Sequence, residues 1–401
     1  MPRFFWSAFW VLFYLGLTCL VSIPAGAAEH VINPSVRARE TYDDNVFFID
    51  MTDFEHLIAP TIELNSRTER TSLNATATWN ISEYERHSQF DTVDQSYQLS
   101  GGMSLTSRAQ LELSGNYIRD YTFNETLEEL GVVAERSVRT TASVQPRAII
   151  EWTPRNRIEA VYDFNKTQYR LDRYPDYRAH DLSLTWTHDQ MNERTSIIVQ
   201  LGGSQVDYAI GDEDLRQQTL QGLIGINHRF TEAFQVTLQG GARYTDSRVP
   251  KTEFIFVPPY FVFTDTKTVR ERDTGFILYS QLGWRSERMT VSAEVMRDFI
   301  PSIYGEDMTR DRVRASLRYQ FLEHFQCGFT GAYYHSQTEG LIRTQERETY
   351  SARPMINYRF SEHARLELGY AYTKTKDEIT EHSDERNQIF VQVRAEWPYY
   401  N

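Results

Sequence analysis

The sequence lacks the features that hold most small secreted domains together. It has only two cysteines, and one of them, Cys19, lies in an apolar N-terminal segment. Cys327 would be alone once that segment is removed, so an internal disulfide framework is excluded. No proline- or serine-rich linker divides the rest of the chain, and no other segment is apolar enough to span a membrane as a helix. We therefore expect one large domain without disulfides.

Charge and motif content argue against further classes. The net charge is -13, and the basic residues form no cluster of the kind that binds nucleic acid. The catalytic and cofactor-binding patterns G-x-S-x-G, H-E-x-x-H, G-x-x-x-x-G-K and C-x-x-C-H are all absent. We therefore predict no enzyme, cofactor or metal site.

The first 27 residues predict export. Arg3 precedes a long apolar run, and the small residues "AGA" follow at 25–27. This order is typical of a signal peptide, here residues 1–27, with cleavage before Ala28. An uncleaved membrane anchor is the alternative, because the apolar run is long for a signal peptide.

Strict alternation of apolar and polar residues runs through the remaining chain. In "NQIFVQVRAEWPYYN" (387–401), Ile389, Val391 and Val393 alternate with Gln392 and Arg394. The segments "AFQVTLQGGARYTDSR" and "DRVRASLRYQF" repeat the pattern. Because a strand sends successive side chains to opposite faces, each of these segments predicts a strand with one apolar and one polar face.

The spacing of these strands predicts a transmembrane barrel. Very short turns recur roughly every forty residues, near "SRTER", "TSRA" and "TPRN", and longer polar connections lie between them. We predict an all-β fold with a single antiparallel β-barrel over residues 28–401, of about 18 strands or alternatively 16. Its short turns would be periplasmic and its long loops extracellular. A soluble sandwich or propeller is the alternative. Aromatic residues beside the short turns match an interfacial girdle: Trp152, Phe230, Trp284, Phe321, Phe360 and Trp397.

The polar faces of the strands would line a lumen. The alternation along each strand places these pore-lining candidates on the polar face: Arg243, Arg312, Arg314, Arg318, Arg353, Arg359, Arg394, Glu294 and Glu367. Two interpretations remain open. Arginines and carboxylates can cross-link neighbouring strands, or the arginine-rich part can attract anionic solutes.

Two kinds of loop add candidates. The connection 248–269 is rich in aromatics, and Phe254, Phe256, Tyr260 and Phe261 could form a constriction, stack on sugar rings or simply extend a hairpin. Acidic clusters occur at "YDDN" (42–45), "GDED" (211–214) and "KDEITEHSDE" (376–385). They could bind divalent cations that bridge lipopolysaccharide, although none has EF-hand spacing and solvated loop charge is the simpler interpretation.

Residues 36–48, "VRARETYDDNVFF", resemble the first strand of a group of bacterial outer-membrane β-barrel porins. Several members of that group are associated with exopolysaccharide or protein-sorting loci. The resemblance implies the bacterial outer membrane as location, and outer-membrane lipid, lipopolysaccharide and the barrel assembly machinery as partners, with polysaccharide as a further partner. We expect a porin-like channel for polar, including saccharide, solutes. The alternatives are a structural or assembly barrel linked to surface exopolysaccharide and, third, an outer-membrane barrel enzyme.

Overall fold

The structure is a computed structural model that describes residues 29–122, 136–190, 194–210, 213–257, 261–301, 307–339 and 344–400. The expected signal peptide, residues 1–27, lies outside these ranges. Within them, no helix combines the length and apolar character needed to cross a membrane.

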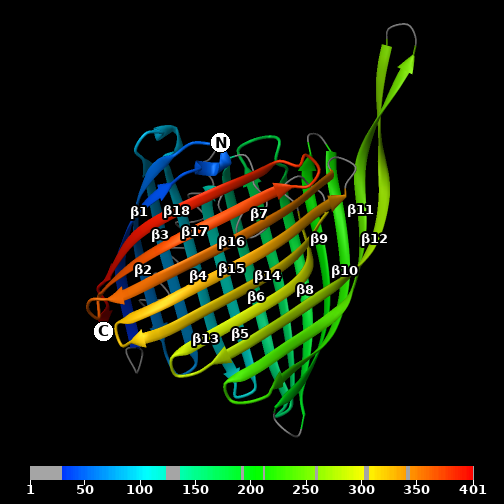
Figure 1. Cartoon of the computed structure of the whole chain (residues 1–401). Coiled ribbons are helices and arrows are strands. Elements are labelled where there is room, and N and C mark those ends of the chain that lie inside the picture. The colour runs from blue at the N-terminus through cyan, green and yellow to red at the C-terminus, as the bar shows by residue number, and fades with distance from the viewer. Residues whose placement is uncertain are drawn as a thin grey trace.

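The described residues form eighteen long strands in a row, each antiparallel to the next (Figure 1). The first nine are β1 (Glu29–Asp43), β2 (Asp53–Arg67), β3 (Thr71–Tyr84), β4 (Thr92–Thr106), β5 (Ala109–Tyr121), β6 (Val138–Thr153), β7 (Asn156–Tyr169), β8 (Asp176–Asp189) and β9 (Thr195–Ile210). The second nine are β10 (Glu213–Arg229), β11 (Phe234–Val257), β12 (Phe261–Arg285), β13 (Met289–Pro301), β14 (Asp307–Leu322), β15 (Phe325–Glu339), β16 (Thr344–Arg359), β17 (Ala364–Asp377) and β18 (Ser383–Glu396). Two short 3-10 helices, η1 (Val46–Phe48) and η2 (Ser88–Phe90), and the two-residue strand β19 (Tyr399–Tyr400) complete the described elements.

The two ends of the chain close this sheet into a barrel. β1 pairs with β2 on one side and with β18 on the other, from Ser35 opposite Glu396 to Asp43 opposite Gln388. β19 adds the pairs Val31–Tyr400 and Ile32–Tyr399 to the same seam. Each strand of the described barrel wall therefore pairs with a neighbour on both sides, which is what a β-structure needs in lipid. The prediction of a single antiparallel barrel with 18 strands is confirmed.

The alternation seen in the sequence separates the two faces of the wall. Leu182, Leu201, Leu220 and Ile224 have relative exposures of 58%, 58%, 66% and 65%, and they lie on the outer face. Their polar neighbours face the lumen. A large apolar exposure of this kind is costly in water and favourable in lipid.

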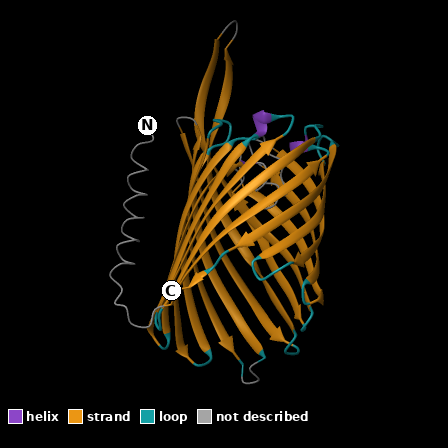
Figure 2. Ribbon diagram, turned by 90° about the vertical axis from the view of Figure 1, so that its left-hand side faces the viewer, coloured by secondary structure: helices purple, strands orange, loops and turns teal. Residues whose placement is uncertain are grey.

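The two rims differ as the sequence predicted. Short turns gather at the rim near residue 29 and the C-terminus, and longer connections lie at the opposite rim (Figure 2). Beside the short turns, Trp152, Phe230, Phe321, Phe360 and Trp397 project outward with relative exposures between 48% and 71%. They form the expected interfacial girdle.

The connection over residues 248–269 is not the irregular loop that its composition suggested. β11 and β12 stay paired from Phe234–Trp284 to Val257–Phe261, and the hairpin projects far beyond the long-loop rim (Figure 1). Phe254, Phe256 and Phe261 belong to this hairpin, and nothing is described of their side chains; Tyr260 lies outside the described residues. The backbone follows the hairpin alternative and runs away from the barrel mouth.

Candidate functional site

The lumen face carries all nine candidate residues from the sequence. Cross-strand register fixes this, because residues directly opposite each other share a face. Arg312 and Arg314 of β14 are opposite Met296 and Glu294, and Arg353 of β16 is opposite Thr330. Glu367 is opposite Gln392, and Arg359 and Arg394 are both opposite Arg365. Whether these residues act on solutes stays a prediction.

Arginines dominate one side of the lumen, which we call the arginine wall. It spans β14 to β18, which cross the front of the barrel in Figure 1, and the neighbouring β1 at its left edge. Arg359, Arg365, Arg394 and Arg37 occupy directly neighbouring positions on β16, β17, β18 and β1. The wall consists of Arg37, Arg39, Arg310, Arg312, Arg314, Arg318, Arg347, Arg353, Arg359, Arg365, Arg386 and Arg394.

Several of these arginines cross-link the wall. Arg312 Nη2 lies 2.5 Å from Glu294 Oε1, and Arg310 Nη2 lies 2.6 Å from Asp298 Oδ2. Arg365 Nη2 lies 3.1 Å from Glu396 Oε1. This supports the cross-linking interpretation for part of the set.

Arg314 and Arg318 are different. Both side chains are exposed to the lumen, and neither contacts a carboxylate of the described residues. Arg314 is 3.5 Å from the hydroxyl of Tyr334, which carries no charge. Uncompensated guanidinium groups in an aqueous lumen create a positive potential that small anions experience.

Carboxylates predominate on the opposite side, which we call the carboxylate wall: Asp94, Glu112, Asp120, Glu151, Glu159, Asp163 and Asp181 on β4 to β8. Arg139 and Arg147 neutralise part of it. Arg139 lies 2.9 Å from Asp120, and Arg147 lies 3.2 Å from Glu112 and 2.9 Å from Glu159. Asp163 and Asp181 are directly opposite on β7 and β8. Like charges in that position repel each other.

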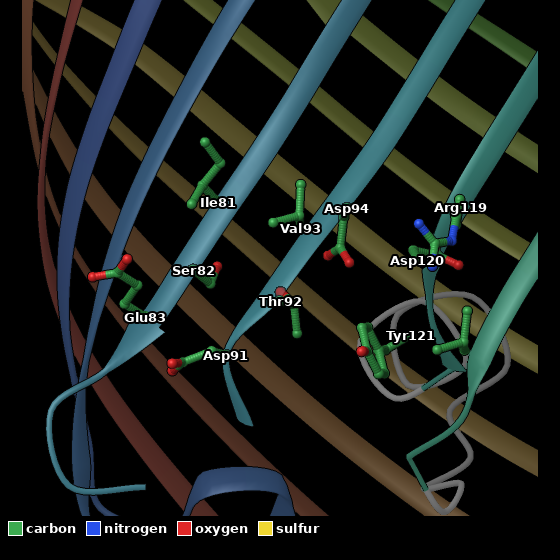
Figure 3. Close-up of a pocket in the computed structure, with 11 residues that line it drawn as sticks. Ile81, Ser82, Glu83, Asp91, Thr92, Val93, Asp94, Arg119, Asp120 and Tyr121 are labelled. Atoms are coloured by element: carbon green, nitrogen blue, oxygen red, sulfur yellow. The ribbon is translucent and has the colours of Figure 1, made fainter. Parts of the chain in front are cut away.

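A cavity of about 280 Å³ lies at the long-loop end of the carboxylate wall (Figure 3). Asp94 and Asp120 project into this region from adjacent strands, and Ser82 and Tyr121 help to line it. One oxygen of Asp94 is buried without a hydrogen-bond partner in the described part of the chain. The cavity therefore brings two acidic side chains close together at this end of the barrel.

Arg243 is a structural residue rather than a free lumen charge. Its side chain is 2% exposed, and it donates to Asp273 and to the hydroxyl of Thr245, each at 2.5 Å. The guanidinium carbon lies 3.0 Å from the centroid of the Phe299 ring. A Cβ on Gly275 would be 2.7 Å from that ring, so this glycine allows the ring to approach. Arg243 is thus removed from the solute path.

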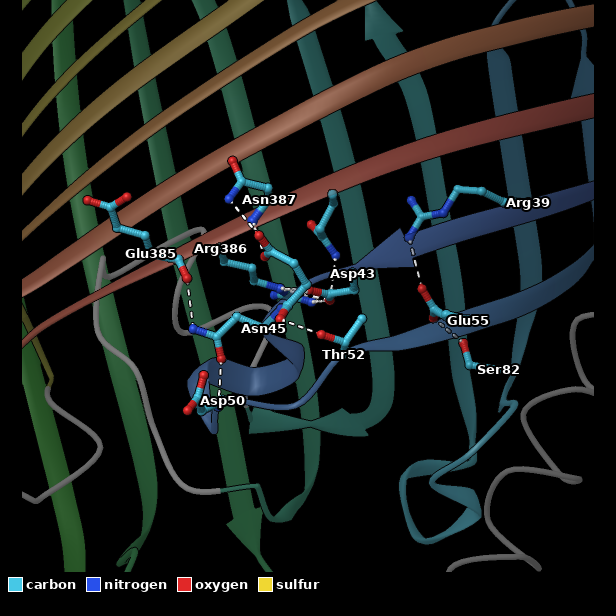
Figure 4. Close-up of polar contacts among 12 residues, drawn as sticks. Arg39, Asp43, Asn45, Asp50, Thr52, Glu55, Ser82, Glu385, Arg386 and Asn387 are labelled. Carbon is cyan, nitrogen blue, oxygen red and sulfur yellow. Dashed lines mark hydrogen bonds and ion pairs between the residues drawn. The ribbon is translucent and has the colours of Figure 1, made fainter.

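The "YDDN" segment binds the other end of the chain (Figure 4). Arg386 of β18 donates to Asp43 Oδ2 from Nε at 2.9 Å and from Nη2 at 2.5 Å. The backbone N–H and the side-chain amide of Asn387 both donate to Asp44 at 2.7 Å. Asn45 donates to the carbonyl of Glu385 at 2.7 Å. We call this set of contacts the seam clasp.

The seam clasp corrects one expectation from the sequence. Asp43 is only 3% exposed in its side chain, and its oxygens are occupied by protein donors. The segment is therefore neither a free cation site nor solvated loop charge. Elsewhere, Lys376 pairs with Glu378 and Lys374 with Glu385 in the third acidic cluster. Among the described residues, no group of three or more acidic, histidine or cysteine side chains is placed to hold a metal ion.

Aromatic packing fixes two long-rim loops beside the clasp. Val46 and Phe47 are buried, and Phe47 contacts Tyr84 and Phe90. Arg136 stacks on the Tyr121 ring with its guanidinium carbon 4.0 Å from the centroid, and it donates to the carbonyl of Phe90 at 2.6 Å. This cluster holds the loop after β1 and the loop after β3 together.

Sequence reasoning missed several lumen residues. Arg37, Arg347, Arg365 and Arg386 extend the arginine wall, and Asp94, Asp120 and Asp181 extend the carboxylate wall. Alternate residues of one strand share a face, so the alternation that placed other residues of these strands in the lumen would also have placed these residues there. The pairing of Arg386 with Asp43 had no signal in the sequence, because 343 positions separate the two residues.

Comparison with protein-family models and with curated proteins gives no match. Solved structures do match. The copper transporter OprC aligns with a TM-score of 0.52 and 10% identity over 90% of this chain, which spans 66% of OprC. OccAB3 of Acinetobacter baumannii and the outer membrane protein opdK of Pseudomonas aeruginosa each align at a TM-score of 0.45, over 92% of this chain and 99% of theirs, with 10% and 11% identity. At such low identity the likeness shows the fold alone, and that fold is an outer-membrane β-barrel.

Proposed function

We propose that the barrel is an outer-membrane channel for small polar solutes, including saccharides, and that it favours anions along the arginine wall. The observation that carries this proposal is the pair Arg314 and Arg318, two exposed lumen arginines without a carboxylate partner in the described chain. A barrel of 18 strands is wide enough for an aqueous lumen.

Charge separation across the lumen supports the same proposal. A solute with an anionic group would be attracted to the arginine wall, and any cationic group would be attracted to the carboxylate wall. Salt screens such interactions over about 10 Å at 0.1 M, so preference for anions should be strongest at low ionic strength. The carboxylate wall opposes the preference, which should therefore be modest.

The test is the reversal potential of the refolded protein in a planar bilayer under a salt gradient. Replacing Arg314 and Arg318 by glutamine removes charge and keeps polarity, so the potential should move toward cation preference. The control replaces Arg155 and Arg288, which are exposed in short turns outside the lumen, by glutamine. That variant should keep the potential of the unmodified protein.

Two results would contradict the proposal, the first its preference for anions and the second the channel itself. One is an unchanged reversal potential in the Arg314/Arg318 variant combined with lower thermal stability, which would make these arginines structural. The other is a folded barrel with no measurable conductance. The second result would favour the alternative of a structural or assembly barrel linked to surface exopolysaccharide.

A further inference from the structure

A row of five positive side chains and one carboxylate crosses the outer face near the long-loop rim. Lys166 of β7 is opposite Arg178 of β8, which is opposite Asp207 of β9. Asp207 is opposite Arg216 of β10, and the row continues through Arg248 of β11 to Arg270 of β12. Adjacent strands are about 4.8 Å apart, so the row extends over roughly 24 Å. We call these six residues the outer row.

The outer row faces away from the lumen. Arg178 lies four residues before Leu182 and shares its face, and Arg216 lies four residues before Leu220. These leucines belong to the apolar outer surface. The row therefore lies directly above the lipid-facing band, on the side of the long loops.

Positive charge exceeds negative charge in and around the row. Arg216 Nε lies 2.6 Å from Asp207, and Arg270 pairs with Asp246. Arg272 is opposite Asp246, so Arg248, Arg270 and Arg272 surround a single carboxylate. Arg178, Arg248 and Arg272 are exposed.

Outer positions on β13 to β17 carry no such surplus. They are Arg297, Asp311, His335, Glu348 and Lys376, each directly opposite the next. Arg297 and Asp311 form a direct pair at 2.5 Å. The positive surplus on β7 to β12 is thus local, and it occurs in a chain whose net charge is -13.

We propose that the outer row binds the phosphate groups of a phosphorylated glycolipid in the outer leaflet. Positive side chains directly opposite each other, such as Arg216 and Arg248, repel unless an anion lies between them. Guanidinium groups bind phosphate oxygens in a bidentate manner. The anions that lie against the outer wall, just above an apolar band, are the headgroup phosphates of the surrounding lipid.

The test measures binding of lipid A by the folded, detergent-solubilised full chain. The variant replaces Arg178, Arg248 and Arg272 by glutamine and keeps the Arg216–Asp207 and Arg270–Asp246 pairs. We expect the variant to bind lipid A about tenfold or more weakly, because charge-assisted hydrogen bonds to phosphate are lost. The matched control replaces Arg297, Lys374 and Lys376 by glutamine on the balanced strands β13 to β17, and it should bind like the unmodified chain.

Three further measurements sharpen the result. Dephosphorylated lipid A should bind as weakly to the unmodified chain as lipid A does to the variant. Inorganic phosphate at the same concentration should not compete, since the apolar chains of the lipid contribute to binding. The bilayer conductance of the variant should stay unchanged, which separates this surface from the proposed channel.

The proposal would be overturned if the variant and the control lost the same amount of affinity for lipid A. It would also be overturned if the unmodified chain bound lipid A and dephosphorylated lipid A equally well. The proposal would also be overturned if inorganic phosphate competed with lipid A, or if a soluble anionic polysaccharide bound more tightly than lipid A. Either result would assign the outer row to another anion. Heat-modifiable migration on a gel would verify that each variant is folded.

Discussion

Replacing Asp43 by asparagine should destabilise the barrel at its seam. The change removes the negative charge from a carboxylate that is 3% exposed, and the Arg386 guanidinium, itself 8% exposed, loses its ion pair with that carboxylate. Breaking a buried ion pair by removing one partner costs about 3–5 kcal/mol. The asparagine side chain can still accept the hydrogen bond from the backbone N–H of Asn45, so most of the loss should come from charge.

The consequence should be large because the seam is short. β1 pairs with β2 along its whole length, from Glu29–Arg67 to Asp43–Asp53, whereas its pairing with β18 begins only at Ser35–Glu396. The seam clasp lies at the long-loop end of this shorter ladder, so its loss should allow the first and last strands to separate there.

Equilibrium urea unfolding in lipid vesicles, followed by tryptophan fluorescence, would measure the effect. Arg386→Gln should cost a similar amount, and the double variant should cost less than the sum of the two singles, because both single changes break the same ion pair. Lys374→Gln serves as the control, since Lys374 and Glu385 are 39% and 52% exposed and such pairs contribute at most about 1 kcal/mol. A loss for Asp43→Asn no greater than that of the control would refute the reasoning.

Three other predictions concern the two faces and the location of the barrel. Leu317→Arg on the outer face should lower the free energy of unfolding by about 2–4 kcal/mol in the same assay. Ser316→Arg should lower it by less, because that side chain meets water. Equal losses would mean that the two faces are misassigned. Asp181→Asn should remove the repulsion between Asp181 and Asp163. The reversal potential should then move toward anion preference, and the free energy of unfolding should be equal or up to about 1 kcal/mol higher. A move toward cation preference would contradict the carboxylate wall. The chain should sediment with the outer membrane and migrate heat-modifiably, and recovery from the soluble periplasm would contradict the barrel.

The fold was predictable because a barrel repeats one simple pattern. Alternation in segments such as 387–397 assigns each side chain to a face, and turn length assigns each rim. Both kinds of information are local. The sequence over 248–269 predicts a loop, because it carries prolines and aromatics without clean alternation, yet β11 and β12 stay paired there from Arg248–Arg270 to Val257–Phe261.

The partners of the charged residues could not be predicted in the same way. Parity places Arg312, Arg314 and Arg318 together on the lumen face, but it does not say that Arg312 reaches Glu294 while Arg318 meets no carboxylate among the described residues. That distinction depends on cross-strand register and on side-chain length. It is also what divides structural arginines from candidates for solute binding.

The net charge of the chain conceals how the barrel distributes its charges. A total of -13 suggests a molecule that repels anions, and it argues against nucleic acid as a partner. The closed sheet, however, separates charges by face and by strand, so that carboxylates collect on β4 to β8 in the lumen while arginines collect on the facing wall and along the outer row. Interactions beyond about 10 Å are screened at 0.1 M salt, so a solute or a lipid phosphate responds to the nearest wall and not to the total. Two anion-attracting surfaces are therefore compatible with an acidic protein, and they can be tested independently because one faces water inside the barrel and the other faces lipid.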